Sequence, residues 1–247
     1  MLHREHHDSV LLIRLAHGKA SALDLELMSA LERELDLARE AGAVVLTGVG
    51  GIFSAGVDLY RLVDGGEAYA KEFFPLLVRL LRKLFMLPAP LVVACNGHAI
   101  AGGGIFVASG DRRLMAEGRG RLGVPELLVG VPFPALALEI VRYALGPRAQ
   151  YLAFTGATLS PDQAKAIGLV DEVVAADELE AKAIAAAKQF AAIPRDAFRL
   201  AKMQLRQPFV DAAERLKDAD AEALKLWADA RTHAHIREYL AKTITKK

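Results

Sequence analysis

Residues 90–111, PLVVACNGHAIAGGGIFVASGD, place an apolar run, a glycine loop and a second apolar run in direct succession. The run PLVVACNG (90–97) is rich in apolar and β-branched residues, which is typical of a strand buried on both faces. Three adjacent glycines follow at 102–104, and glycine loses more backbone freedom on folding than any other residue. We therefore expect a ligand to approach the backbone closely at this loop. The run GIFVASG (104–110) predicts the helix that the loop opens.

The same succession of a strand and a glycine loop occurs earlier in the chain. AVVLTG (43–48) predicts a buried strand, and GVGGIFSAGVDL (48–59) predicts the loop after it. Further strands are predicted at 9–16 and 112–117, and amphipathic helices at 23–41, 67–87 and 134–146. Because strands alternate with helices, we expect an α/β fold in which helical crossovers join parallel strands.

The strand signals stop after about residue 176, and long amphipathic helices follow. Pro194 and Pro208 are expected to interrupt these helices. We therefore divide the chain into an α/β core, residues 1–190, and a helical C-terminal region, residues 191–247. The N-terminus, which carries His3, His6 and His7, is expected to be mobile.

The composition excludes several classes of protein. The 31 basic and 30 acidic residues give a net charge of +1, which argues against a nucleic-acid or anionic-membrane partner. Residues 84–110 carry no formal charge, but their prolines and glycines favour a buried strand and loop over a membrane helix. The N-terminus lacks the features of a signal peptide, so we expect a cytoplasmic protein. The single cysteine, Cys95, excludes an internal disulfide and a multi-cysteine metal site, and is expected in the core.

The two glycine loops indicate where the chemistry takes place. α/β folds bind ligands in loops at strand ends, and the first N–H groups of a helix have no partner within it. Two such donors facing one point would form an oxyanion hole, although glycines also occur where a loop only needs a tight turn. Neither loop has the Gly-Lys-Ser/Thr of a phosphate-binding loop or the spaced glycines of a dinucleotide site.

Five motifs in order resemble the enoyl-CoA hydratase/isomerase family, also called the crotonase superfamily. The motifs are HGKASALD (17–24), GIFSAGVDL (51–59), NGHAIAGGG (96–104), GVPELLVGV (123–131) and FTGATLSPDQAKAIGLVDEVV (154–174). The resemblance covers about residues 8–176. It implies a core of repeated ββα units and a C-terminal helical region that forms trimers or dimers of trimers. It also implies acyl-CoA thioester substrates, with no metal and no cofactor beyond the coenzyme A of the substrate.

The resemblance assigns roles to individual positions. The thioester oxygen would accept hydrogen bonds from the backbone N–H groups of Val57 and Gly102. Further substrate contacts are implied at Lys19, Ala20, Ala22, Ala55, Asp58, Gly103, Ile105 and Phe133. We also expect Asp58 to cap the helix that follows it.

One acid of the family's hydratases is missing from this chain. Those enzymes hold a water molecule between two glutamates, whose positions fall on Ile105 and Glu126 here. Members of the Δ3,Δ2-enoyl-CoA isomerase branch resemble this chain in having an aliphatic residue at the first position. A single base can move a proton from C2 to C4 of a 3-enoyl-CoA, and Ile105 would then be a dry wall. The apolar neighbours of Glu126 are expected to raise its pKa.

Other reactions remain open from the sequence. Glu139 could replace the missing acid of a hydratase if its helix turned inward, although a surface position on that helix is favoured. The stretch PFPALAL (132–138) replaces a glycine-rich stretch of the hydratases, so Phe133 and Leu136 are expected to shorten or redirect the acyl pocket. A thioesterase or decarboxylase on the same scaffold is also possible, as is an oligomer that binds acyl-CoA without turnover.

Overall fold

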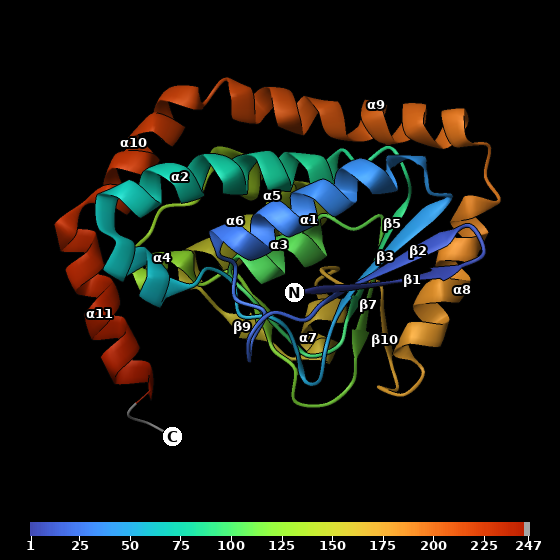
Figure 1. The fold of residues 1–247 in the computed structure, drawn as a ribbon, viewed down its shortest axis with the longest axis horizontal. Helices are drawn as coiled ribbons and strands as arrows, with labels where there is room; N and C mark the ends of the chain where they lie inside the picture. The colour runs from blue at the N-terminus through green and yellow to red at the C-terminus, as the bar shows by residue number, and fades with distance from the viewer. Residues whose placement is uncertain (245–247) are drawn as a thin grey trace.

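The computed structural model describes residues 1–244 and contains two β-sheets (Figure 1). The larger sheet has six strands in the order β1-β2-β3-β5-β7-β10. Its strands are β1 Leu2–His7, β2 Val10–Leu15, β3 Ala43–Gly48, β5 Leu91–Cys95, β7 Arg112–Ala116 and β10 Glu172–Val174. β1 pairs antiparallel with β2, and all the other neighbours are parallel. The predicted parallel α/β sheet is therefore confirmed.

The smaller sheet positions the glycine loops. Its order is β4-β6-β8-β9, with β4 at Ile52–Ser54, β6 at His98–Ile100, β8 at Leu122–Gly123 and β9 at Thr158–Leu159. β4, β6 and β8 each follow a strand of the larger sheet and precede a helix. These helices are α2 Leu59–Phe85, α3 Gly102–Ala108 and α4 Glu126–Val129. The chain thus repeats a ββα unit three times, and β4, β6 and β8 lie side by side in parallel.

Helices cover both faces of the larger sheet. Alternate residues of β2 point to opposite faces, so Leu11 and Ile13 join one hydrophobic cluster and Val10 and Leu12 join another. The smaller cluster lies under α8, Leu179–Ala191. The larger cluster includes side chains of α1 Leu25–Leu37, α2, α3 and α5 Ala135–Leu145. Burial on both faces explains why the strands read as unbroken apolar runs.

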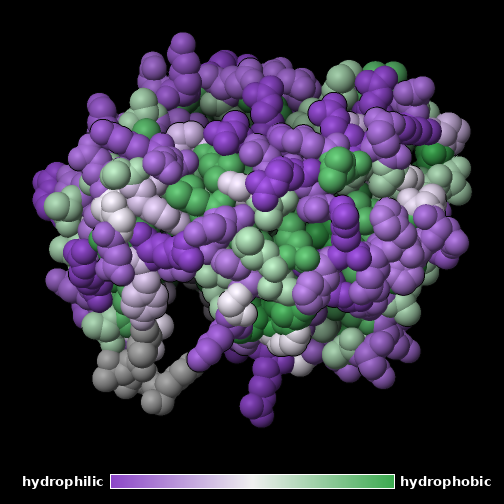
Figure 2. Space-filling view, in the orientation of Figure 1, coloured by the Kyte–Doolittle hydropathy of each residue, from purple (hydrophilic) through white to green (hydrophobic). Residues whose placement is uncertain are grey.

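The remaining helices complete the shape seen in Figure 1. They are α6 Arg148–Thr155, α7 Pro161–Ala166, α9 Arg195–Glu214, α10 Lys217–Ala228 and α11 Ala230–Ile244, with a 3₁₀ turn at Ala38–Glu40. α9 packs on α5, while α10 and α11 pack on α2. Charged and polar side chains dominate the face shown in Figure 2, with hydrophobic residues visible between them. Within residues 1–244, no helix is long and apolar enough to cross a membrane.

Three elements differ from the sequence prediction. The expected mobile terminus is wrong, because residues 2–7 form β1, whose backbone pairs along the whole of β2. Pro208 lies inside α9 and does not end the helix. α2 begins at Leu59, eight residues earlier than predicted, and contains the non-helical Gly66 (φ +62°). The boundary at residue 190 falls next to the end of α8 and stays a prediction.

Candidate active site

A cavity of about 110 Å³ lies where the ββα units meet α11. Its lining residues are Ala55, Val57, Leu59, Ile100, Ala101, Pro125, Glu126, Val129, Val131 and Tyr239. They come from the end of β6, from the loops after β4, β6 and β8, from the first turn of α2, from α4 and the segment after it, and from α11. On the face shown in Figure 2 the molecule is hollowed beside α11. Among the lining residues, only Glu126 and Tyr239 have polar groups in their side chains.

Glu126 is the first residue of α4, directly after Pro125. It is only 6% exposed, and its Oε2 has no hydrogen-bond partner within the described residues. Burial raises the pKa of Glu126 to about 8, although a hydrogen bond from its own backbone N–H opposes this rise. A carboxyl group with this pKa can both accept and release a proton near neutral pH.

The Val57 N–H is a free donor because of how its loop pairs with Leu23. Leu23 donates to the Gly56 carbonyl at 2.7 Å and accepts from the Asp58 N–H at 2.9 Å. In a parallel pair of this kind, the N–H of the residue opposite Leu23 points away from it. Within residues 1–244, no hydrogen bond to the Val57 N–H occurs, and the side chain of Val57 lines the cavity.

The second donor belongs to the first turn of α3. Gly102 is the first helical residue, so its N–H has no partner within the helix. Ala101 before it is anchored, because its N–H donates to the Gly123 carbonyl at 2.9 Å. The loop of Gly56 lies directly against this turn: a Cβ built on Gly56 would lie 3.2 Å from the Gly102 nitrogen. The Val57 and Gly102 N–H groups therefore belong to two loops in contact, of which Val57 and Ala101 line the cavity and Gly102 itself does not.

Ala101 has a strained backbone at this position. Its φ of 52° and ψ of −125° lie in a region that residues with a Cβ rarely adopt. Such a conformation costs about 1–3 kcal/mol and persists only where the surroundings hold it. The strain lies at the entry to α3, beside the free Gly102 N–H.

Close packing against the protein's own backbone explains two of the three adjacent glycines. A Cβ on Gly103 would lie 2.5 Å from the Ser54 carbonyl oxygen, and one on Gly104 would lie 2.6 Å from the Gly123 oxygen. A Cβ on Gly102 would meet only the Leu23 Cδ1, at 2.7 Å. A ligand is therefore not needed to explain Gly103 and Gly104, which let α3 approach β4 and β8 closely, and close approach of a ligand at this loop stays a prediction.

The segment HGKASALD lies against the loop of Val57. The Ala20 carbonyl accepts from the Ala55 N–H at 2.9 Å, and the Ser21 carbonyl accepts from the Ser54 hydroxyl at 2.8 Å. Ala22 is half-buried and Lys19 is exposed. Of the predicted substrate contacts in these two segments, only Ala55 and Val57 line the cavity.

Asp58 has a structural role in this region. It is the N-cap of α2, and its carboxylate accepts from the Arg61 N–H at 3.0 Å. The prediction that it caps the helix is confirmed.

Ile105 and Phe133 belong to the hydrophobic core. Ile105 is 1% exposed and Phe133 is 8% exposed, and neither lines the cavity. Leu136, expected to shorten the acyl pocket, is also buried in the core and does not line the cavity. The aliphatic side chains that line the cavity in place of Ile105 include those of Leu59, Val129 and Val131.

Tyr239 was missed by the sequence reasoning. Its side chain reaches the cavity from α11, the last helix of the chain. The amphipathic pattern of residues 230–244 predicts a helix, but it does not say which other element that helix covers. Leu59, Ile100, Ala101 and Pro125 lie within the recognised motifs, and membership of a motif is the signal that could have identified them.

The other ionisable and nucleophilic candidates lie outside the cavity wall. Glu139 is 4% exposed, against the expected surface position, and forms an ion pair with Arg142 at 2.6 Å. Cys95 is buried in β5, as predicted, and burial raises the pKa of its thiol to about 12. His233 is buried with its Nε2 2.7 Å from the Trp227 carbonyl oxygen. Among residues 1–244, no cluster of three or more His, Cys, Asp or Glu side chains could hold a metal ion.

The chain matches the model of the enoyl-CoA hydratase/isomerase family over residues 5–243. It belongs to this family. A mitochondrial enoyl-CoA delta isomerase 1 of Rattus norvegicus is 28% identical over 229 residues, which cover 90% of this chain and 79% of the relative. The protein is thus an enzyme of the crotonase superfamily, and the expected ββα fold is that of its relatives.

Solved structures of this family carry names for two reactions. The crystal structure of human mitochondrial delta3-delta2-enoyl-CoA isomerase is 25% identical, with a TM-score of 0.93 and coverage of 100% of this chain and 99% of that chain. An enoyl-CoA hydratase of Mycobacterium ulcerans is 30% identical, with a TM-score of 0.84 and coverage of 90% and 98%. Membership of the enoyl-CoA hydratase/isomerase family therefore does not by itself select isomerisation or hydration.

Proposed function

We propose that this enzyme converts a 3-enoyl-CoA to the 2-enoyl-CoA, with Glu126 as its single acid and base. The observation that carries the proposal is the unpartnered Glu126 carboxyl group in a cavity otherwise lined by apolar side chains and one tyrosine. Hydration requires a second group that orients water and supplies a proton. Glu139, the carboxyl group that the sequence offers for that role, is paired with Arg142 and does not line the cavity.

The reaction begins when the thioester carbonyl accepts hydrogen bonds from the Val57 and Gly102 N–H groups. Glu126 removes a proton from C2, and the electrons shift toward the carbonyl oxygen to form a dienolate. The two N–H donors stabilise the negative charge that develops on this oxygen. The protonated carboxyl group then returns the proton at C4, which leaves the double bond between C2 and C3. No atom is gained or lost, and the apolar wall limits access of water to the intermediate.

Coenzyme A would lie along Lys19, Ala20 and Ala22, in the segment that packs against the loop of Val57. No further cofactor is required. We also propose that helices α9–α11 join the subunits into a trimer or a dimer of trimers. The cytoplasmic location stays a prediction from the sequence.

The test is a paired assay on the purified protein. A 3-enoyl-CoA and a 2-enoyl-CoA of the same chain length are supplied separately, and products are separated by chromatography. We expect isomerisation of the first and little hydration of the second. Efficient hydration would contradict the proposal and would mean that a second acid operates. Release of free coenzyme A or carbon dioxide would indicate a thioesterase or decarboxylase, and binding without any product would indicate a non-catalytic acyl-CoA-binding protein.

The pH dependence of isomerisation follows from the raised pKa of Glu126. Only the ionised carboxylate can remove a proton, so kcat/KM is expected to rise about tenfold per pH unit up to about pH 8 and then level off. The measurement is kcat/KM for a 3-enoyl-CoA between pH 5.5 and 9.5. A profile that is flat from pH 5.5 upward would place the base in water-exposed surroundings and contradict the buried site.

A further inference from the structure

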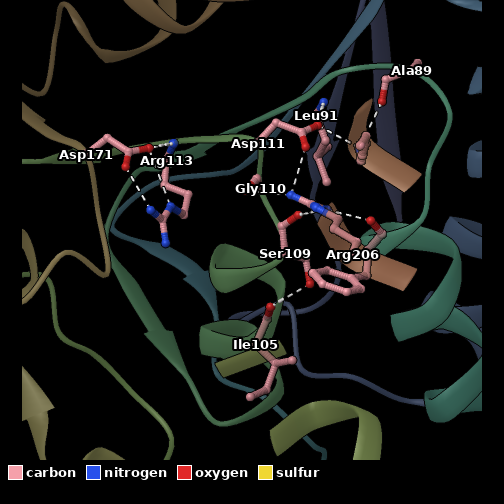
Figure 3. Close-up of polar contacts among 11 residues, drawn as sticks. Ala89, Leu91, Ile105, Ser109, Gly110, Asp111, Arg113, Asp171 and Arg206 are labelled. Atoms are coloured by element: carbon pink, nitrogen blue, oxygen red, sulfur yellow. Dashed lines mark hydrogen bonds and ion pairs between the residues drawn. The ribbon is translucent and has the colours of Figure 1, made fainter. Parts of the chain in front are cut away.

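Arg206 joins the C-terminal ends of two helices. It lies on α9 and is 1% exposed. Its Nη1 donates to the Phe85 carbonyl at 2.5 Å and to the Ser109 carbonyl at 2.9 Å. Its Nη2 donates to the Gly110 carbonyl at 3.1 Å (Figure 3). Phe85 is the last residue of α2, and Ser109 is the C-cap of α3.

These two helices are the ones whose starts carry the proposed oxyanion donors. α2 begins at Leu59, two residues after Val57, and α3 begins at Gly102 itself. One guanidinium group therefore holds the far ends of both helices. α3 has only seven residues and no kink, so it connects Ser109 to Gly102 almost as a rigid rod. Because Gly66 interrupts α2, the connection through α3 is expected to dominate.

The surroundings of Arg206 fix its guanidinium group. Its Nη2 lies 2.8 Å from the Asp111 carboxylate. Its Cζ lies 4.5 Å from the ring centroid of Phe85 and 5.0 Å from that of Tyr143. Of its donor nitrogens only Nε is buried without a partner within the described residues. The planar guanidinium presents its donors in a rigid fork. A cation at the C-terminal end of a helix also interacts favourably with the helix dipole.

Lys202 binds the same carboxylate but not the helix ends. It lies one turn before Arg206 on α9, and its Nζ is 2.7 Å from the Asp111 Oδ2 and 3.2 Å from the Ala89 carbonyl. Both cations thus attach α9 to the segment after α3. Only Arg206 contacts the carbonyls of Phe85, Ser109 and Gly110, which separates its effect on the helix ends from the attachment of α9.

We propose that Arg206 is a positioning residue for the oxyanion hole, acting through α3 and secondarily through α2. The inference rests on the proposed function, because it requires the Val57 and Gly102 N–H groups to bind the thioester oxygen. It gives α9, far from the cavity, a part in catalysis. A shift of the α3 end would move the Gly102 N–H relative to the Val57 N–H, and misplacement by about 1 Å can cost on the order of 100-fold in rate.

The experiment compares Arg206→Met and Arg206→Lys with the matched control Lys202→Met in the full chain. Each variant is first checked for folding by thermal denaturation. The readouts are kcat and KM for a 3-enoyl-CoA, and the infrared carbonyl band of a bound saturated acyl-CoA labelled with ¹³C at the thioester carbon. We expect Arg206→Met to lower kcat by about 10-fold to 100-fold with KM changed less than about threefold. Its carbonyl band should move back toward the position in free solution.

The remaining variants separate the possible results. Arg206→Lys keeps the positive charge, but an ammonium group cannot donate to three carbonyls as the planar guanidinium does. We therefore expect a band position and a kcat between those of the wild type and Arg206→Met. If Arg206→Met does not fold, Arg206→Lys provides the test. Lys202→Met should keep the wild-type band and kcat. The proposal is overturned if the folded Arg206 variants retain the wild-type carbonyl band and the wild-type kcat. It is also overturned if Lys202→Met lowers kcat and shifts the band as much as Arg206→Met does. A wild-type band unchanged from free solution would instead refute the oxyanion hole, and this inference with it.

Discussion

Glu126→Gln is expected to lower kcat for isomerisation of a 3-enoyl-CoA by about 10²-fold to 10⁴-fold, with little change in substrate binding. The amide has nearly the shape of the carboxyl group, so the cavity keeps its volume. It cannot accept the C2 proton or return it at C4, so both proton transfers are lost. The measurement is kcat from product formation, together with the dissociation constant of a saturated acyl-CoA.

Glu139→Gln is the matched control for this prediction. Glu139 is as buried as Glu126, but it pairs with Arg142 on α5 and does not line the cavity. We expect this variant to keep wild-type kcat. A large loss in Glu139→Gln, or substantial activity in Glu126→Gln, would show that the base has been assigned to the wrong carboxyl group.

The stability of Glu126→Gln gives an independent check that the loss is chemical. The pKa of Glu126 is about 8 in the folded protein and 4.5 in a model compound, so burial favours the protonated form. Its contribution to stability is fully present below pH 4.5 and is lost as the pH rises through 8. The free energy of unfolding of Glu126→Gln, relative to that of the wild type, should therefore rise by roughly 2–4 kcal/mol between pH 5 and pH 8. Chemical denaturation at the two pH values measures the difference.

The fold could be predicted where local pattern and burial agree. β3 and β5 are buried along their whole length, so nearly all of their residues are apolar and the runs are visible in the sequence. β1 could not be recognised, because it lies at the sheet edge with polar side chains and is ordered by backbone pairing with β2. β8 and β9 have two residues each, too few for any periodicity.

The site could be predicted where a motif carries the residues, and not where distant segments meet. Glu126 and the Val57 loop belong to motifs, whereas Tyr239 reaches the cavity through the packing of α11. Lys202 and Arg206 are charged residues on an amphipathic helix, a pattern typical of an exposed face. They are buried because Asp111 and several backbone carbonyls satisfy them, and burial lowers the pKa of Lys202 to about 8.

Gly56→Ala is the second variant with a large expected effect, because Gly56 allows close contact between the two loops that carry the proposed oxyanion donors. Its φ is +80°, and a Cβ there would lie 2.5 Å from the Ile100 carbonyl oxygen and 2.8 Å from the Ala101 Cβ. Neither atom can move freely, since Ile100 belongs to β6 and Ala101 is already strained. The loops must therefore separate, which moves the Val57 N–H away from the Gly102 N–H. We expect kcat to fall by about 10²-fold to 10³-fold, as when one oxyanion donor is removed.

Gly50→Ala separates this effect from backbone strain. Gly50 also has a positive φ, +60°, but a Cβ there would meet nothing within 4 Å. Both variants should lose stability, by about 1 kcal/mol for Gly50→Ala and by more for Gly56→Ala, because alanine is unfavourable at positive φ. Only Gly56→Ala should lose kcat, measured well below its melting temperature and at saturating substrate. If both variants kept wild-type kcat, the contact between the two loops would not set the positions of the donors, and the carbonyl would have to be stabilised by other groups.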